Sequence, residues 1–286
     1  MNRGWEILDS GQVSDITKSK KAFDELTAFH WRYYSELAFQ RRPIREELNR
    51  ALREAATPFE FTRWQRVVKF KYSFNPLSAK GSLADPGGRF NIGAIDSTRY
   101  PMFPALYLAA DKGTAMAEVL GRKTANSSLS AEELALTKPD SISVLSVSGK
   151  LEAVLDSRLD EKLEPFVALI KDFNLSPGLR SAARALKVPL DLVRTVGRLQ
   201  DVLVKQNWRD WPMLYDVPAG GQIFGSIALD AGIEAIVYES VITGKPCLAI
   251  FPQNFLNSTA FVELDDPVPS DEIPRRMDST NFTRFV

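Results

Sequence analysis

The chain has 286 residues, of which 44% are apolar and 25% charged, so it can build a sizeable core and is not a disordered protein. Its 36 basic residues balance 36 acidic ones, and this zero net charge disfavours nucleic acid as a direct partner. One cysteine and one histidine exclude an intramolecular disulfide and a zinc site built from Cys and His ligands.

The shortage of histidine and cysteine also limits the possible chemistry. His30 lies in an aromatic-rich stretch predicted to be helical, so we interpret it as a packing or surface residue rather than a general base. Cys247 lies in an apolar strand and is interpreted as a small buried hydrophobic residue. Any reaction would then depend on carboxylates, Arg, Lys, Tyr and Ser, and we expect no metal.

The sequence offers no sign of membrane insertion or secretion. No segment of 18 or more apolar residues occurs, and the first residues lack the apolar core of a secretory signal. We therefore expect no membrane partner and a cytoplasmic protein.

The first part of the chain changes from helical to extended and then to loop. Residues 1–57 have apolar side chains at three- and four-residue spacing, which predicts an N-terminal helical segment. A β-rich run, WQRVVKFKY, follows at 64–72. Four prolines and four glycines between 73 and 104 predict a long loop, and loops of this length inside a domain are often functional.

The later elements are inferred from apolar runs and helix start signals. They are strands at 105–110, 141–149, 233–240 and 245–252, and helices at 111–123, over most of 150–206, and at 220–232. Together they predict an α+β fold with a central mixed β-sheet. We expect three parts: a helical segment at 1–57, a domain at 58–265 with a helical insertion at about 122–205, and a polar, loosely ordered tail at 266–286.

A first candidate site lies in the long loop, in the sequence GGRFN at 87–91. The two glycines let the backbone approach a ligand closely, and Arg89 offers a planar fork for a phosphate or carboxylate. Asn91 can bind its own turn or a ligand. The same pattern is also typical of an ordinary turn with a solvated arginine.

Three further side chains are candidates. Glu118 has mostly apolar neighbours in its helix, and burial of a carboxylate is costly unless a partner or ligand compensates for it. Tyr107, in the preceding strand, could stack on a planar ligand or simply pack in the core. Ser240 ends a strand, where functional residues and ordinary turn residues both occur. The glycine-rich GGQIFG at 220–225 is interpreted as a helix start, because it matches neither GxGxxG nor a Walker sequence.

The order of these motifs resembles the RES domain, a family named for its characteristic Arg, Glu and Ser. The resemblance covers roughly residues 63–255, with a longer helical middle, and it rests on GGRFN, ALYLAADKGTAMAEVL, NWRDWP and QIFGSIALDAGIEAIVYESVITGKPCLAIFP. Members are known as NAD⁺-consuming toxins of bacterial toxin–antitoxin pairs, with a fold similar to ADP-ribosyltransferase toxins. The resemblance implies catalytic roles for Arg89, Glu118 and Ser240, and NAD⁺-binding roles for Tyr107 and Asn91.

The chain departs from the family pattern at three points. The family's early arginine could be Arg66, which residue identity favours, or Lys71 followed by Tyr72, which the spacing to Arg89 favours. The family's PSAR element is altered around Ser240, with Lys245 as a substitute for its arginine. The helical segment at 1–57 is longer than a compact toxin needs.

The candidate residues suit cleavage of the nicotinamide–ribose bond of NAD⁺. The leaving group is neutral nicotinamide, so a carboxylate that stabilises positive charge, cations for the pyrophosphate and an aromatic surface suffice. The resemblance implies an NAD⁺ glycohydrolase, phosphorylase or ADP-ribosyltransferase with NAD⁺ as substrate, no separate cofactor, and a helix-turn-helix antitoxin as partner. The alternatives are a binding or regulatory module with a degraded site, and a hydrolase of another substrate that uses Ser240 or Glu118.

Overall fold

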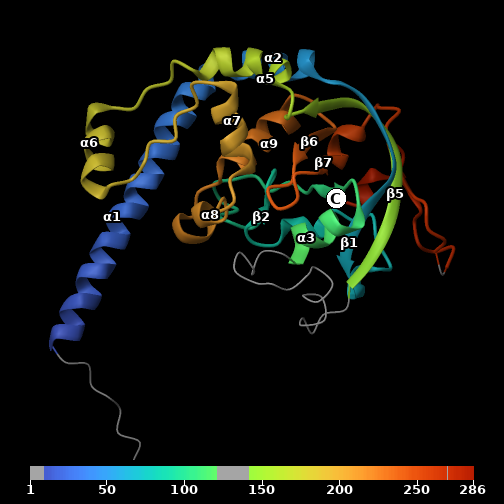
Figure 1. The fold of residues 1–286 in the computed structure, drawn as a ribbon, viewed down its shortest axis with the longest axis horizontal. Coiled ribbons are helices and arrows are strands. Elements are labelled where there is room, and N and C mark those ends of the chain that lie inside the picture. Colours follow the sequence, from blue (N-terminus) through green and yellow to red (C-terminus); the bar gives the residue numbers. More distant parts are fainter. Residues whose placement is uncertain (1–9, 121–141, 269) are drawn as a thin grey trace, which may run out of the picture. The chain divides into compact units, whose positions relative to one another are not determined.

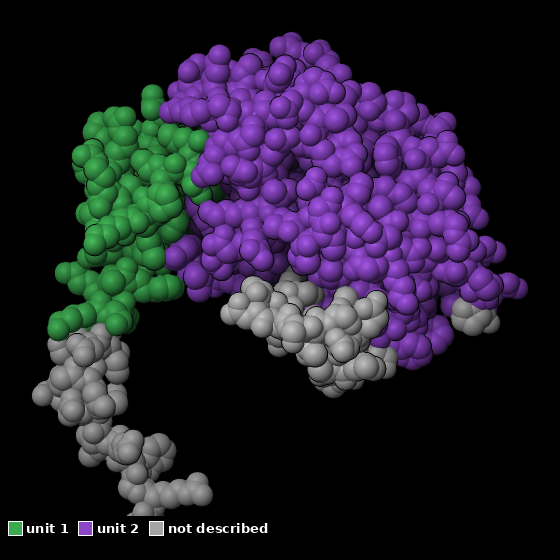
Figure 2. Space-filling model, viewed as in Figure 1, with its two compact units in different colours: residues 1–43, 173–192 green, residues 44–172, 193–286 purple. Residues whose placement is uncertain are grey.

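The structure is a computed structural model that describes residues 10–120, 142–268 and 270–286 (Figure 1). Its contacts divide the chain into two compact units (Figure 2). Unit 1 comprises residues 1–43 and 173–192, and unit 2 comprises residues 44–172 and 193–286. No helix in the described part of the chain is both long and apolar enough to cross a membrane.

Unit 1 contains the long helix α1 (Ser10–Arg41) and the short helix α6 (Pro177–Leu186). Some of their apolar side chains, among them Phe29 and Leu179, are buried. Glu36 accepts hydrogen bonds from the backbone N–H and the hydroxyl of Ser176, at 2.8 and 2.7 Å, and Ser176 in turn caps α6. The predicted N-terminal helix is confirmed, although its partner helix comes from a distant part of the sequence.

Unit 2 contains the sheet and the remaining elements. The helices are α2 (Arg45–Ala55), α3 (Lys112–Leu120), α5 (Asp160–Ile170), α7 (Val196–Val204), α8 (Asp210–Tyr215) and α9 (Gly220–Asp230). The strands are β1 (Thr57–Lys69), β2 (Gly87–Gly88), β3 (Asn91–Ile92), β4 (Leu106–Ala109), β5 (Ile142–Asp156), β6 (Ala235–Glu239), β7 (Pro246–Ile250), β8 (Phe261–Leu264) and β9 (Arg276–Asp278).

The main sheet has seven strands in the order β1-β4-β7-β6-β5-β8-β9. Strand β1 also pairs with β5 over most of its length, so β1, β4, β7, β6 and β5 pair in a closed ring. Figure 1 shows β1 and β5 as two long curved strands side by side. Strands β5 and β6 are parallel and all other pairs are antiparallel, which confirms the predicted α+β fold with a mixed sheet.

The two faces of this sheet differ in character because side chains alternate along each strand. On one face Leu108 of β4, Leu248 of β7 and Val237 of β6 join the main hydrophobic core. Their neighbours along the strands therefore point to the opposite face, which carries Tyr107 and Tyr238. This second face is the one on which the candidate residues gather.

The stretch 150–206, predicted to be mainly helical, begins instead with strand at residues 150–156, because β5 continues through them to Asp156. Leu151 and Val154 have a helix-like spacing, yet both enter the core while the strand backbone pairs with β1, and with β6 near its end. A pairing partner on each edge thus overrides the local pattern. Strand β1 also begins earlier than predicted, at Thr57, and residues 121–141 of the predicted insertion lie outside the described residues.

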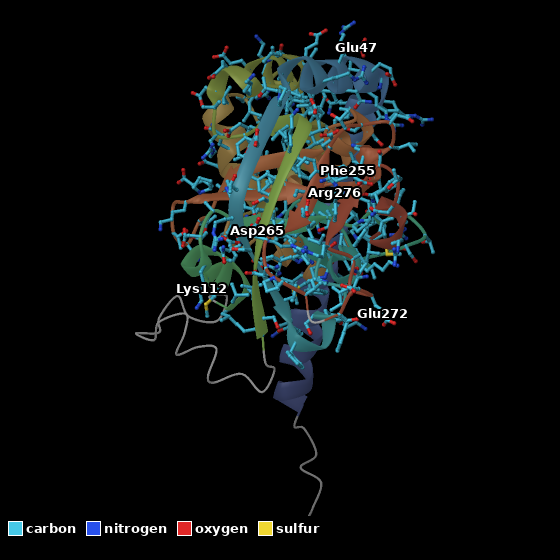
Figure 3. The ribbon with its side chains drawn as sticks, turned by 90° about the vertical axis from the view of Figure 1, so that its right-hand side faces the viewer. Glu47, Lys112, Phe255, Asp265, Glu272 and Arg276 are labelled. Atoms are coloured by element: carbon cyan, nitrogen blue, oxygen red, sulfur yellow. The ribbon has the colours of Figure 1, made fainter. Side chains whose placement is uncertain are left out.

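The C-terminal segment is packed rather than loosely ordered, which corrects the expectation for residues 266–286. Strand β9 pairs with β8, and Phe285 is fully buried in the core with its carbonyl bonded to the N–H of Ala79 at 2.8 Å. Arg276, labelled in Figure 3, lies 3.9 Å over the ring of Phe261. Three apolar side chains among many polar ones suffice to anchor the tail: Ile273, Met277 and Phe285.

Candidate functional site

Glu118 and Ser240 meet in the structure. Glu118 lies on α3, whose first residue, Lys112, is labelled in Figure 3. Ser240 directly follows β6. The Ser240 hydroxyl donates a hydrogen bond of 2.6 Å to Oε1 of Glu118. The Ser240 hydroxyl oxygen in turn accepts from the N–H groups of Ile242 and Thr243, both at 3.3 Å, and Ser240 is only 1% exposed. This geometry suits a serine that orients a carboxylate, since none of the hydrogen-bond partners of the Ser240 hydroxyl among the described residues is a histidine that could activate it as a nucleophile.

The turn after Ser240 is tied to the start of α3. Asp111 accepts from the N–H and hydroxyl of Thr114, and its Oδ2 lies 3.2 Å from Nζ of Lys245. Burial acts to raise the pKa of Asp111, but the bonds from Thr114 and Lys245 outweigh it and hold the pKa below its usual value. Lys245, the predicted substitute for the family's arginine, thus forms an ion pair at the edge of the site.

The GGRFN turn is held from inside by Asn91. Its Oδ1 accepts hydrogen bonds from the Gly88 N–H and the Tyr107 hydroxyl, both at 2.9 Å. Its Nδ2 donates to the carbonyls of Ser82 and Phe103. Tyr107 completes the arrangement because its hydroxyl accepts from the Phe90 N–H at 3.0 Å. Asn91 therefore shapes the turn with all of its polar atoms, and Tyr107 links the turn to β4.

Arg89 projects from this turn toward the end of α7. Its Nη1 donates to the carbonyls of Lys205 at 2.8 Å and Leu203 at 3.4 Å, and the guanidinium lies 6.0 Å from the ring of Trp208. These carbonyls close a helix C-terminus, where a cation is stabilised. Among the described residues Nε and Nη2 of Arg89 have no hydrogen-bond partner, so they remain available to an anion.

Tyr238 is the central residue that the sequence reasoning missed. It is 3% exposed and its ring lies 4.9 Å from that of Phe90. Burial raises the pKa of Tyr238 well above its usual value, and four neighbouring side chains also act on it: Cys247, Glu118 and Tyr107 raise the pKa, and Arg89 lowers it. Tyr238 precedes Ser240 by two residues, so strand alternation could have placed both on one face.

Cys247 faces Tyr238 in the register of β6 and β7 and is fully buried. Burial raises the pKa of its thiol to about 12, and the charge of Glu118 contributes to this rise. The thiol therefore stays protonated and unreactive, in agreement with its interpretation as a small buried residue.

Arg66, one of the two candidates for the early cation, lies apart from this group. Gln65 pairs with Ala109, which shares a face with Tyr107, so Arg66 points to the opposite face of β1. There Nη2 of Arg66 donates to the Ser78 carbonyl at 2.6 Å, while its buried Nε and Nη1 have no partner among the described residues. Burial lowers the pKa of Arg66 to about 9.

Lys71 and Tyr72 lie in the short 3₁₀ turn Phe70–Tyr72 that follows β1. The Lys71 side chain lies outside what the structure describes, and Tyr72 is exposed. The site thus brings together Arg89, Asn91, Tyr107, Glu118, Tyr238 and Ser240, and leaves the choice between Arg66 and Lys71 open.

Other features do not add to this group. A pocket of about 430 Å³ in unit 1 is lined by residues of α6 and the turn after it, including Arg180, Arg184 and Lys187, and contains none of the predicted site residues. The described residues contain no group of three or more His, Cys, Asp or Glu side chains that could hold a metal ion.

Comparison with known proteins matches part of the chain to a family model. The model of the RES domain matches residues 63–185, which include Arg89, Tyr107 and Glu118 but end before Ser240. Curated proteins gave no match. Among solved structures, the crystal structure of the M. tuberculosis MbcT–MbcA toxin–antitoxin complex is similar, with 17% identity and a TM-score of 0.43 over 84% of this chain and 97% of that one. Similarity at this level carries no conclusion about function.

Proposed function

From the match of residues 63–185 to the RES domain, we propose that the chain is a RES-type toxin that cleaves NAD⁺ at the nicotinamide–ribose bond. One observation carries the proposal. The Glu118 carboxylate is fixed by the buried Ser240 hydroxyl, close to Tyr238, on which Arg89 and Tyr107 also act. This set contains a carboxylate, a cation and aromatic rings, which are the groups that the reaction needs.

The proposed reaction breaks the bond between the ribose C1 and the nicotinamide nitrogen, and the electron pair of that bond neutralises the pyridinium ring. Positive charge then develops on the ribose, and a fixed carboxylate nearby stabilises it more strongly than water does. One oxygen of Glu118 accepts from Ser240, and the other, which has no partner among the described residues, can accept from a ribose hydroxyl. The acceptor, which is water, phosphate or a protein side chain, bonds to C1 and releases its proton.

Arg89 is proposed to bind the pyrophosphate of NAD⁺. Its two available N–H groups suit a phosphate oxygen, and a guanidinium pairs with phosphate through two parallel bonds. A second cation would come from Arg66 or Lys71. Tyr107 offers its ring to the nicotinamide or adenine, while Asn91 acts through the turn.

The family also suggests the partner and the setting. RES toxins pair with antitoxins, so we propose an antitoxin, of the helix-turn-helix type, and a cytoplasmic site of action. NAD⁺ is the substrate, and no resident cofactor is needed for this chemistry.

The test is NAD⁺ loss in the presence of the purified chain and of Glu118→Gln, followed by chromatography of nicotinamide. The amide keeps the shape of the side chain but removes its charge, so we expect turnover to fall ~10²–10³-fold while the protein stays folded. Glu164→Gln, an exposed change on α5, should retain full turnover.

The outcomes separate the proposal from its rivals. Near-normal turnover by a folded Glu118→Gln protein would overturn the assignment. Binding of NAD⁺ by the wild-type chain without any loss would favour a binding module with a degraded site, and an absence of binding would favour a hydrolase of another substrate.

A further inference from the structure

The GGQIFG sequence at the start of α9 lies directly against the turn that carries Arg89. A Cβ atom on Gly221 would lie 2.6 Å from the Arg89 carbonyl oxygen, and one on Gly225 would lie 1.9 Å from that of Phe90. The backbone of α9 therefore meets the backbone of the turn, and only glycine allows this approach. These glycines do not form a phosphate-binding loop, because the space that a phosphate would need is filled by the turn.

Gln222 lies between these glycines and is fully buried. Its Oε1 accepts from the Ala219 N–H at 3.0 Å. Its Nε2 lies 2.8 Å from the Pro86 carbonyl oxygen, 3.0 Å from that of Asn91 and 3.2 Å from that of Gly88, so its two N–H groups are shared among three acceptors. The bond to Ala219 suffices to cap the helix, and the three carbonyl contacts go beyond capping.

The turn is thus held from two sides. The Asn91 side chain binds it from within, and the Gln222 amide collects carbonyls that precede and follow Arg89. Within the described ranges, the guanidinium itself forms hydrogen bonds only through Nη1. The direction in which Arg89 leaves the backbone consequently depends on these two amides.

We propose that Gln222 is a positioning residue that fixes the Pro86–Asn91 turn, so that Arg89 reaches the phosphates of the substrate. Its role in turnover rests on the proposed NAD⁺ cleavage, whereas its hold on the turn does not. The GGRFN turn and the GGQIFG start of α9 thus pack against each other at Gly221 and Gly225, and the Gln222 amide joins them through hydrogen bonds.

The first experiment needs no NAD⁺. Hydrogen–deuterium exchange of the full chain is followed in peptides that cover residues 86–93, in the wild type, in Gln222→Met and in a matched control, Asn254→Leu. Asn254 is a suitable control because its amide donates to the carbonyls of Leu229 and Ile233 at the other end of α9. We expect at least a tenfold faster exchange in Gln222→Met alone, and unchanged exchange in that variant would overturn the proposal.

The second experiment separates positioning from general stability. Gln222→Met is expected to raise KM for NAD⁺ about tenfold with a smaller change in kcat, because binding of the phosphates suffers most. In an Arg89→Ala background the same change should raise KM no further. An equal rise in both backgrounds would contradict a role through Arg89.

Gln222→Glu adds a chemical signature. The substitution directs a carboxylate at three carbonyl oxygens. We therefore expect Gln222→Glu to increase both the exchange rate of residues 86–93 and KM for NAD⁺ more than Gln222→Met does. If this variant does not fold, Gln222→Met carries the test. If the wild-type chain leaves NAD⁺ intact, the proposed function fails, and the exchange measurement still decides whether Gln222 holds the turn.

Discussion

Ser240 is buried, and its hydroxyl forms a hydrogen bond to the candidate catalytic carboxylate of Glu118. Its hydroxyl reaches Glu118 at 2.6 Å, and a hydrogen bond to a charged group contributes about 1.5–3 kcal/mol. We expect Ser240→Ala to lower NAD⁺ turnover by roughly 10- to 100-fold, which is the same free energy expressed as a rate. Steady-state kinetics of NAD⁺ loss provide the measurement.

The control for this change is Ser157→Ala, which removes an equally buried hydroxyl that bonds to the Val237 carbonyl at 2.8 Å. This variant should lose stability without losing turnover. Complete inactivity of a folded Ser240→Ala protein would instead indicate that Ser240 is a nucleophile, and the hydrolase alternative would gain.

Burial of the Arg66 guanidinium is expected to lower the stability of the fold. Two of its guanidinium nitrogens are buried without a partner among the described residues, and burial lowers its pKa to about 9. An apolar replacement of a poorly compensated buried charge is often stabilising by about 1–4 kcal/mol. Arg66→Met should therefore raise the free energy of unfolding in urea, and Lys71→Met is measured beside it.

The same two variants decide which residue is the early cation. Spacing favours Lys71, so we expect Lys71→Met to weaken NAD⁺ turnover more than Arg66→Met. If Arg66→Met abolishes turnover and Lys71→Met has none of this effect, the arginine is the early cation and its buried charge is retained for the substrate. If neither variant matters, the chain has no early cation.

Among the elements, α9 and α7 offer a matched pair of glycine substitutions. A Cβ on Gly225 would overlap the Phe90 carbonyl oxygen at 1.9 Å, whereas nothing lies within 4 Å of a Cβ on Gly197 in α7. Gly225→Ala should lower the free energy of unfolding by about 1–3 kcal/mol through overpacking. Gly197→Ala should raise it by about 0.5–1 kcal/mol, because alanine favours the helix.

Urea denaturation of both variants checks this pair. Wild-type stability in Gly225→Ala would mean that the backbones of α9 and the GGRFN turn are not in contact. The proposed hydrogen bonds from Gln222 to this turn would then lack the close approach on which they depend. A destabilised Gly197→Ala would point to a contact of α7 that the space around Gly197 does not suggest.

At the level of the whole molecule, the C-terminal residues complete the core of unit 2. Phe285 is fully buried and its carbonyl accepts from Ala79, which lies in the long loop after β1. Phe285→Ala should cost about 3–5 kcal/mol of unfolding free energy, whereas Phe74→Ala, at a ring that is 72% exposed, should cost almost nothing. Thermal and urea unfolding measure both, and equal stability of the two variants would show that the tail is dispensable.

The sequence alone determined the fold class and predicted candidate residues that the structure brings together. Apolar periodicity predicts α1, β4, α3, β6 and β7 because these elements carry their pattern within a few consecutive residues. Residue chemistry and motif order select Arg89, Tyr107, Glu118 and Ser240, and the structure brings all four into one neighbourhood. The scarcity of histidine and cysteine limits the candidate catalytic groups to carboxylates, Arg, Lys, Tyr and Ser.

Only the tertiary structure decided the features that depend on partners distant in sequence. Residues 150–156 become a strand because β1 and β6 pair with them, and the polar tail becomes ordered because the core has room for Phe285. Tyr238 and Gln222 gain their significance from Glu118 and from the GGRFN turn, which lie more than a hundred residues earlier in the chain. Burial and hydrogen bonding at such separations are properties of packing, and no local pattern of residues encodes them.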